Sequence, residues 1–122
     1  REAGLRAYEL SEEEWIIVQQ LRDVLQVFYD ATQFFSRDNA CLSTVLPAMD
    51  KIDRRLATDS VRKSLKPCIR AACSMGLRTL NRYYDKTDYS DTYRISMVLH
   101  PQYKLEYFKQ ANWEQEWINT AV

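Results

Sequence analysis

Carboxylates come first in a search for chemistry, because two-metal phosphodiester transfer needs several acids converging from different elements. Asp50 and Asp53 could share one helix face and hold a metal ion, but the sequence offers no evident third ligand. The run Glu12 to Glu14 is better explained by a helix start, where exposed amides favour negative charge. We therefore predict that Asp50 and Asp53 lie on a solvated face, and we predict neither a metal site nor a catalytic residue.

Thiol and imidazole groups also fail to assemble a site. His100 is the only histidine, so a zinc site built on imidazoles or a Cys-His pair is not readily formed. Cys68 and Cys73 are five residues apart, which turns them roughly 140° from each other on a helix. We predict that all three cysteines, Cys41 included, are buried small hydrophobes and that His100 lies at a helix junction. Two glycines could hardly build a phosphate-binding loop, so we expect no cofactor, no small-molecule substrate and no enzyme.

Basic residues carry the one signal for a polyanion. From Ser60 to Lys86 there are seven lysines and arginines against the single Asp85. A row of cations four residues apart on one helix face could follow a phosphate backbone. The predicted DNA backbone contacts are Arg62, Lys63, Lys66, Arg70, Arg78 and Arg82. The alternative is simple exposure or pairing with the acidic first helix, because 17 basic and 17 acidic residues cancel over the whole chain.

The elements that must position these residues are predicted to be helices. The chain of 122 residues has only two glycines and three prolines, and no segment alternates apolar and polar residues as a strand would. Ser11 with Glu14 forms a capping box, which begins a helix of about 25 residues. Its apolar stripe recurs every three or four positions, so we predict a central core element. The stripe comprises Trp15, Val18, Leu21, Leu25, Phe28, Thr32 and Phe35, widened by Ile17, Val24 and Ala31.

Prolines set the bounds of the later helices. A second helix follows a cap at Ser43 or Thr44 and carries Pro47 in its first turn. The third is placed with Ser64 as its cap and Pro67 in its first turn, because a proline inside a helix costs about 3 kcal/mol. It ends near Asp85, and residues 61–65 could instead form a separate short turn. Its small residues, Ala71, Ala72 and Gly76, predict close approach of another helix.

Three shorter helices complete the prediction. Residues 91–99 form one, which Pro101 ends, and the same proline begins the next one, over Pro101 to Phe108. A last helix opens at Asn112. The sequence thus predicts one all-α domain over residues 1–122, with about five to seven helices packed around one core and no β-sheet.

The cysteine content and the lengths of the apolar runs indicate where in the cell the protein resides. Three cysteines without a signal-like segment favour a reducing, intracellular location. No apolar run approaches the ~20 residues of a membrane span. Because the chain starts at Arg1, we expect an internal fragment of a larger protein.

Several blocks together resemble one protein family. They are Leu10 to Trp15, Phe28 to Thr32, Val45 to Pro47, Leu80 to Tyr84 and Met97 to Pro101, the last followed by Lys104 and Leu105. In order and spacing they resemble the hAT-family DNA transposases, in particular the branch abundant in basidiomycete fungi. His100 and Gln102 stand where much of that family has aspartate and arginine.

The resemblance implies a place in the helical insertion of an RNase H-like nuclease core whose catalytic acids lie outside this chain. The expected function is a non-catalytic nuclear scaffold for DNA transposition, with the rest of the transposase core as a partner and DNA ends or another subunit as candidate partners. Trp15, Trp113 and Trp117 are candidates for stacking on an extruded base, with none assigned. The alternative is a helical interaction module or homo-oligomer without a DNA role, which would use an aromatic surface. That surface would comprise Tyr89, Tyr93, Tyr103 and Tyr107.

Overall fold

The computed structural model describes residues 8–37 and 41–110, and every regular element in these ranges is helical. Three long helices are α1 (Glu12–Phe35), α2 (Val45–Val61) and α3 (Pro67–Asp88). A single 3₁₀ turn, η2 (Leu42–Thr44), precedes α2, and two short helices follow α3, namely α4 (Thr92–Leu99) and α5 (Lys104–Gln110). The all-α prediction is confirmed. The helix expected from Asn112 lies outside the described residues.

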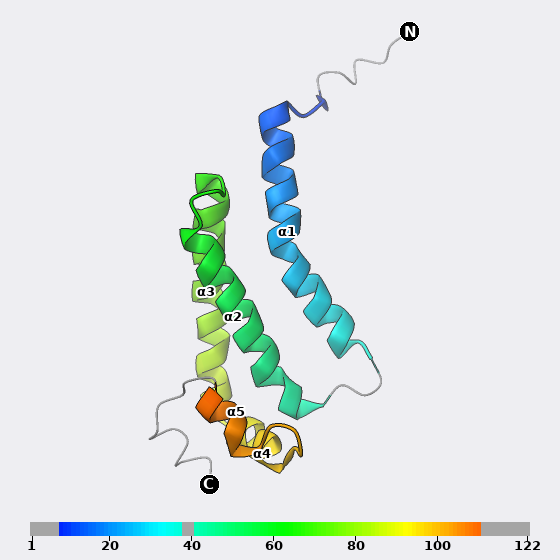
Figure 1. The fold of residues 1–122 in the computed structure, drawn as a ribbon, viewed down its shortest axis with the longest axis vertical. Coiled ribbons are helices and arrows are strands. Elements are labelled where there is room, and N and C mark those ends of the chain that lie inside the picture. The colour runs from blue at the N-terminus through cyan, green and yellow to red at the C-terminus, as the bar shows by residue number, and fades with distance from the viewer. Residues whose placement is uncertain (1–7, 38–40, 111–122) are drawn as a thin grey trace.

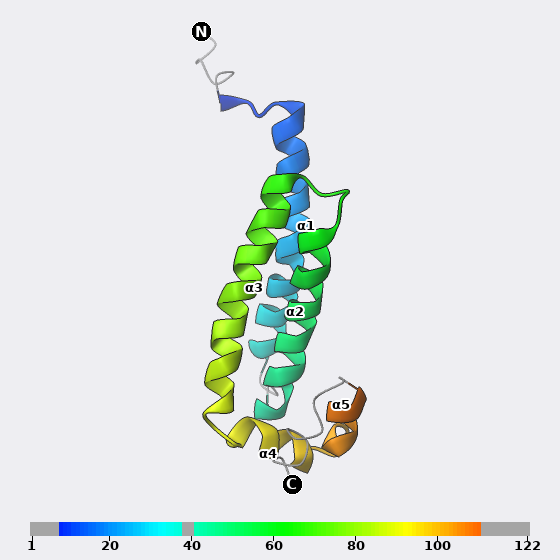
Figure 2. The same cartoon turned by 90° about the vertical axis from the view of Figure 1, so that its left-hand side faces the viewer.

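The long helices form an antiparallel bundle. Figures 1 and 2 show α2 and α3 side by side along their lengths, with α1 on one side of the pair and α4 and α5 across one end. That end is where α2 begins and α3 finishes. In Figure 1 only one side of α1 has neighbouring helices, and in Figure 2 α1 lies behind α2 and α3. No helix in the described ranges is long and apolar enough to cross a membrane.

Local sequence explains how α1 and α3 begin. The predicted capping box is present: the Glu14 amide donates to Ser11 Oγ at 3.3 Å, and the Ser11 amide donates to Glu14 Oε2 at 2.8 Å. These bonds satisfy amides that a helix start leaves unpaired. Pro67 occupies the first turn of α3, as expected, but Lys66 is the cap residue in place of Ser64. Residues 62–65 form a separate turn, closed by the Leu65 amide donating to the Arg62 carbonyl at 3.1 Å.

The expected start of the last described helix is wrong by one turn. The segment from Pro101 to Tyr103 is a turn, and α5 begins at Lys104. The amides of Tyr103 and Lys104 both donate to the His100 carbonyl at 3.2 Å, and Lys104 has a φ of 45°. This left-handed conformation at Lys104 interrupts a helix that would otherwise run from the proline.

Buried side chains form two clusters. The larger lies between the three long helices and comprises Val24, Val27, Ile52, Leu56, Ile69 and Cys73. Of the three small residues predicted to mark a close helix approach, Gly76 faces α2, where an added Cβ would make ordinary contact with Leu56 Cδ1 at 3.4 Å, whereas Ala71 and Ala72 are exposed. The smaller cluster joins α2, α4 and α5 through Leu46, Met97 and Phe108. The bundle and its short end helices are thus held by separate groups of apolar contacts.

The apolar stripe predicted for the core is buried along only one edge of α1. Val18, Leu21, Leu25 and Phe28 are 36–49% exposed, although they were expected in the core. The buried line is the one beside it, with Val24 and Val27 at its centre and Ile17 and Ala31 packed against it. Both lines recur every three or four residues and differ by one residue, or about 100° around the helix. The line of smaller side chains, made of valine, isoleucine and alanine, is the one that packs against α2 and α3.

Candidate functional site

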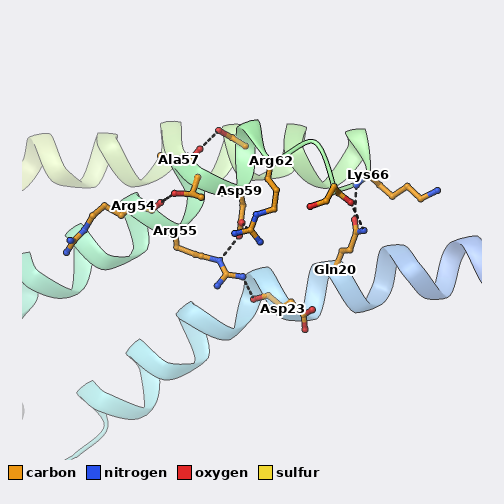
Figure 3. Close-up of polar contacts among 11 residues, drawn as sticks. Gln20, Asp23, Arg54, Arg55, Ala57, Asp59, Arg62 and Lys66 are labelled. Carbon is orange, nitrogen blue, oxygen red and sulfur yellow. Dashed lines mark hydrogen bonds and ion pairs between the residues drawn. The ribbon is translucent and has the colours of Figure 1, made fainter.

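A buried carboxylate organises the end of α2 that lies against α1. Asp59 is 0% exposed, and Arg55 Nε donates to its Oδ2 at 2.5 Å. Arg62 Nη1 lies 3.2 Å from the other oxygen, close enough for an ion pair although that oxygen accepts no hydrogen bond of normal geometry. Arg55 also donates from Nη2 to the Asp23 carbonyl on α1 at 3.2 Å (Figure 3). The buried charge is therefore compensated, and the same arginine links two helices.

Gln20 fastens the α2–α3 turn to α1. Its Oε1 accepts from the Lys66 amide at 2.8 Å, and its Nε2 donates to the Ser64 carbonyl at 3.5 Å (Figure 3). The Lys66 ammonium lies 3.6 Å from Glu13 Oε1. Because an amide side chain carries both a donor and an acceptor, one glutamine can satisfy two backbone groups of the turn.

The six predicted DNA contacts do not form one row. Arg62, Lys63 and Lys66 lie in the α2–α3 connection and not on a shared helix, so the expected alignment of Arg62, Lys66 and Arg70 is absent. Lys66 is paired with Glu13 of α1, as the alternative interpretation held, whereas Arg62 is paired with Asp59 of α2. Lys63 is exposed and has no ion pair among the described residues. Arg62 and Lys66 therefore serve to stabilise the α2–α3 connection.

The cations farther along α3 remain accessible. Arg78 and Arg82 are exposed and four residues apart, and Lys86 continues the spacing with its ammonium 5.1 Å from the centre of the Tyr83 ring. Within the described ranges no ion pair involves Arg78 or Arg82. Arg70 is half-buried, and its Nε is a buried donor that lacks a hydrogen bond there. The exposed face of α3 therefore presents a short cationic row that begins at Arg78.

Asp50 accepts hydrogen bonds from two tyrosines that sequence reasoning did not connect with it. Tyr84 on α3 donates to its Oδ1 and Tyr107 on α5 donates to its Oδ2. Burial raises the pKa of both phenols, and their bonds to the carboxylate raise it further. Burial, followed by the charge of Asp50, also raises the pKa of Asp53. The predicted solvated face is thus wrong for Asp50, which joins three helices.

No group of three or more potential metal ligands occurs among the described residues. Of the cysteines, Cys73 alone is buried, and burial raises the pKa of its thiol. Cys41 and Cys68 are exposed, so the prediction of buried thiols is wrong for these two, both of which lie at helix starts outside the core. The hydrogen bond with Ser43 lowers the pKa of Cys41.

His100 is the cap residue at the end of α4, so its predicted place at a helix junction is confirmed. Its ring lies against that of Tyr103, with ring centres 4.6 Å apart. Trp15, expected in the core, is 52% exposed. Trp113 and Trp117 lie outside the described residues.

The proposed aromatic contact surface is not assembled. Tyr93, Tyr103 and Tyr107 pack against the smaller buried cluster, and only Tyr89 is freely exposed, at 89%. The apolar surface that the structure does present is the outward side of α1. A groove there is lined by Val18, Leu21, Arg22, Leu25, Gln26 and Tyr29. The predicted core stripe is therefore the best candidate for an interaction surface.

Comparison with known proteins overturns the expected transposase function. No family model and no solved structure matches the chain. The chain is similar to "Putative transcriptional regulator tpeD" from Talaromyces stipitatus, with 29% identity over 118 residues. The match covers 95% of this chain but 12% of that protein. It supports neither an hAT transposase insertion nor the alternative module without a DNA role. Of the blocks that suggested the transposases, Leu10 to Trp15 coincides with a helix cap, and Val45 to Pro47 and Met97 to Pro101 each combine a proline with a buried residue. Helical proteins share such features for physical reasons.

Proposed function

We propose that this chain is a non-enzymatic helical segment of a nuclear transcriptional regulator. The observation that carries the proposal is the similarity to the Talaromyces protein along 95% of the chain. The polar groups support a non-enzymatic role, because the buried and half-buried acids are engaged in structural contacts: Asp50 accepts from phenols of two other helices, and Asp59 is paired with two arginines close to it in the chain.

A reporter assay tests this function. The 122 residues are fused to a heterologous DNA-binding domain in fungal cells, and expression from a promoter carrying its site is measured. We expect the fusion to change expression severalfold relative to the DNA-binding domain alone. The control is Leu56→Asp, which places a charge at a core position that is 2% exposed and should abolish the effect by unfolding the bundle. Equal expression with and without the intact chain would refute the proposal.

Within such a regulator, Lys63, Arg78 and Arg82 are the cations that we propose for contacts with the DNA backbone. They are exposed, whereas Arg62 and Lys66 already face acids. Each phosphate neutralised adds a salt-dependent increment to the binding free energy.

Titration of duplex DNA at several salt concentrations tests these contacts. We expect reversal of Arg78 and Arg82 to glutamate to flatten the dependence of affinity on salt by about two units of logarithmic slope. Arg54→Glu is the matched control, because Arg54 is an exposed cation on α2 outside the row. Slopes that are equal in the two variants, or an intact chain that does not bind in dilute buffer, would contradict the role.

A further inference from the structure

The outward side of α1 repeats every seven residues. Val18, Leu21, Leu25, Phe28, Thr32 and Phe35 alternate spacings of three and four, the pattern of a two-helix seam. We call these six residues the outer seam. Its apolar members are 36–49% exposed, and Trp15 and Tyr29 extend it on one flank with 52% and 60% exposure. Helix α1 therefore packs on α2 and α3 with one side and exposes the outer seam on another.

The outer seam is about as large as the largest apolar patch on a typical monomer, and patches of that size often mark interaction sites. With its flanking aromatics it offers roughly 600 Å² of surface, at the top of the range for the largest apolar patch on a typical monomer. Two such surfaces in contact would bury about 1,200 Å², which is where specific protein interfaces begin. Its only charged neighbour within the groove is Arg22.

We propose that α1 pairs through the outer seam with α1 of a second copy of this chain, in antiparallel orientation. The pairing is independent of whether the chain acts in transcription. The seam complements itself: with the two-fold axis between Leu25 and Phe28, Val18 meets the partner's Phe35, Leu21 meets the partner's Thr32 and Leu25 meets the partner's Phe28. Each of these facing pairs then includes an apolar contact. The two helices are identical, so the contact can extend along the 24 residues of α1 in both copies.

Charge selects the antiparallel orientation. The first turn of α1 carries Glu12, Glu13 and Glu14, so a parallel pair would bring six carboxylates together. An antiparallel pair separates the two acidic turns by nearly the helix length, about 36 Å, which is several screening lengths. It also places Arg22, on the groove wall, close to the level of the partner's Tyr29, where a cation can lie over an aromatic ring.

Analytical ultracentrifugation over a range of protein concentrations tests the pairing. We expect the intact 14.5 kDa chain to form a dimer and Leu25→Asp with Phe28→Asp to raise the dissociation constant at least about tenfold. Met75→Asp is the matched control, because Met75 is an apolar residue 67% exposed on α3. Circular dichroism establishes that each variant is helical. A folded intact chain that stays monomeric throughout, or equal weakening by the control, would overturn the proposal.

Cross-linking tests the orientation separately. In a background where the exposed Cys41 and Cys68 are replaced by serine, Val18→Cys and Phe35→Cys chains are mixed and oxidised. An antiparallel seam predicts disulfides between the two variants, because facing positions can meet the 4.4–6.8 Å Cα separation that the bond requires. Disulfides formed only between two Val18→Cys chains would overturn the antiparallel pairing.

Discussion

Removing the phenol hydroxyls that bind Asp50 should destabilise the bundle measurably. Tyr84 and Tyr107 come from α3 and α5, so the Asp50 carboxylate on α2 connects three elements that few other polar contacts join. A hydrogen bond to a charged group contributes about 1.5–3 kcal/mol, and the lower end applies because Asp50 is only half-buried and water can replace a lost donor. We therefore expect Tyr84→Phe and Tyr107→Phe to lower the free energy of unfolding by about 1–2 kcal/mol each.

Urea denaturation followed by circular dichroism measures these losses. The double variant should lose more than the sum of the two single changes, because in each single variant the carboxylate keeps one donor. Tyr89→Phe is the control, since Tyr89 is 89% exposed and its substitution should change stability by less than about 0.5 kcal/mol. Single variants that are indistinguishable from this control would refute the assignment of Asp50 as a connection between helices.

Three further predictions follow from the same contacts. Burial raises the pKa of Tyr84 and Tyr107, so the folded chain holds their protons more tightly than the unfolded chain. The free energy of unfolding should therefore fall as the pH rises above about 10. It should fall less steeply in the variant in which both residues are phenylalanine. Asp59→Asn should cost about 2–3 kcal/mol in urea denaturation, less than for a fully buried ion pair, because water can reach Arg55 and Arg62. Gly76→Ala should raise the thermal midpoint, with about 0.5–1 kcal/mol gained in α3, because its Cβ meets only the end of the Leu56 side chain.

Features that depend on neighbouring residues could be predicted from the sequence. The Ser11–Glu14 capping box and the place of Pro67 follow from bonds within one helical turn, and both are present. The direction in which α1 faces could not be predicted in this way. Ile17, Val24 and Ala31 repeat with the same period as the outer seam, and only the shape of α2 and α3 decides which line is buried.

The polar connections show the same limit. Asp50 lies 34 residues from Tyr84 and 57 from Tyr107, so no local spacing brings them together. The Asp59 pairing did leave a local signal, because Arg55 and Arg62 lie four residues before it and three after it. A carboxylate between two arginines at helical spacing would have identified a buried acid and removed Arg62 from the candidate DNA contacts.

The central claim is that α1 buries one seam within the chain and offers the other to a second copy. Unfolding of Val24→Ala and Leu25→Ala, measured at low and at high protein concentration, tests it most directly. Val24→Ala should cost about 1–2.5 kcal/mol at both concentrations, because Val24 is 6% exposed in the core. Leu25→Ala should cost less than about 0.5 kcal/mol in dilute solution and clearly more when the intact chain is dimeric. Equal losses for the two variants in dilute solution would contradict the account.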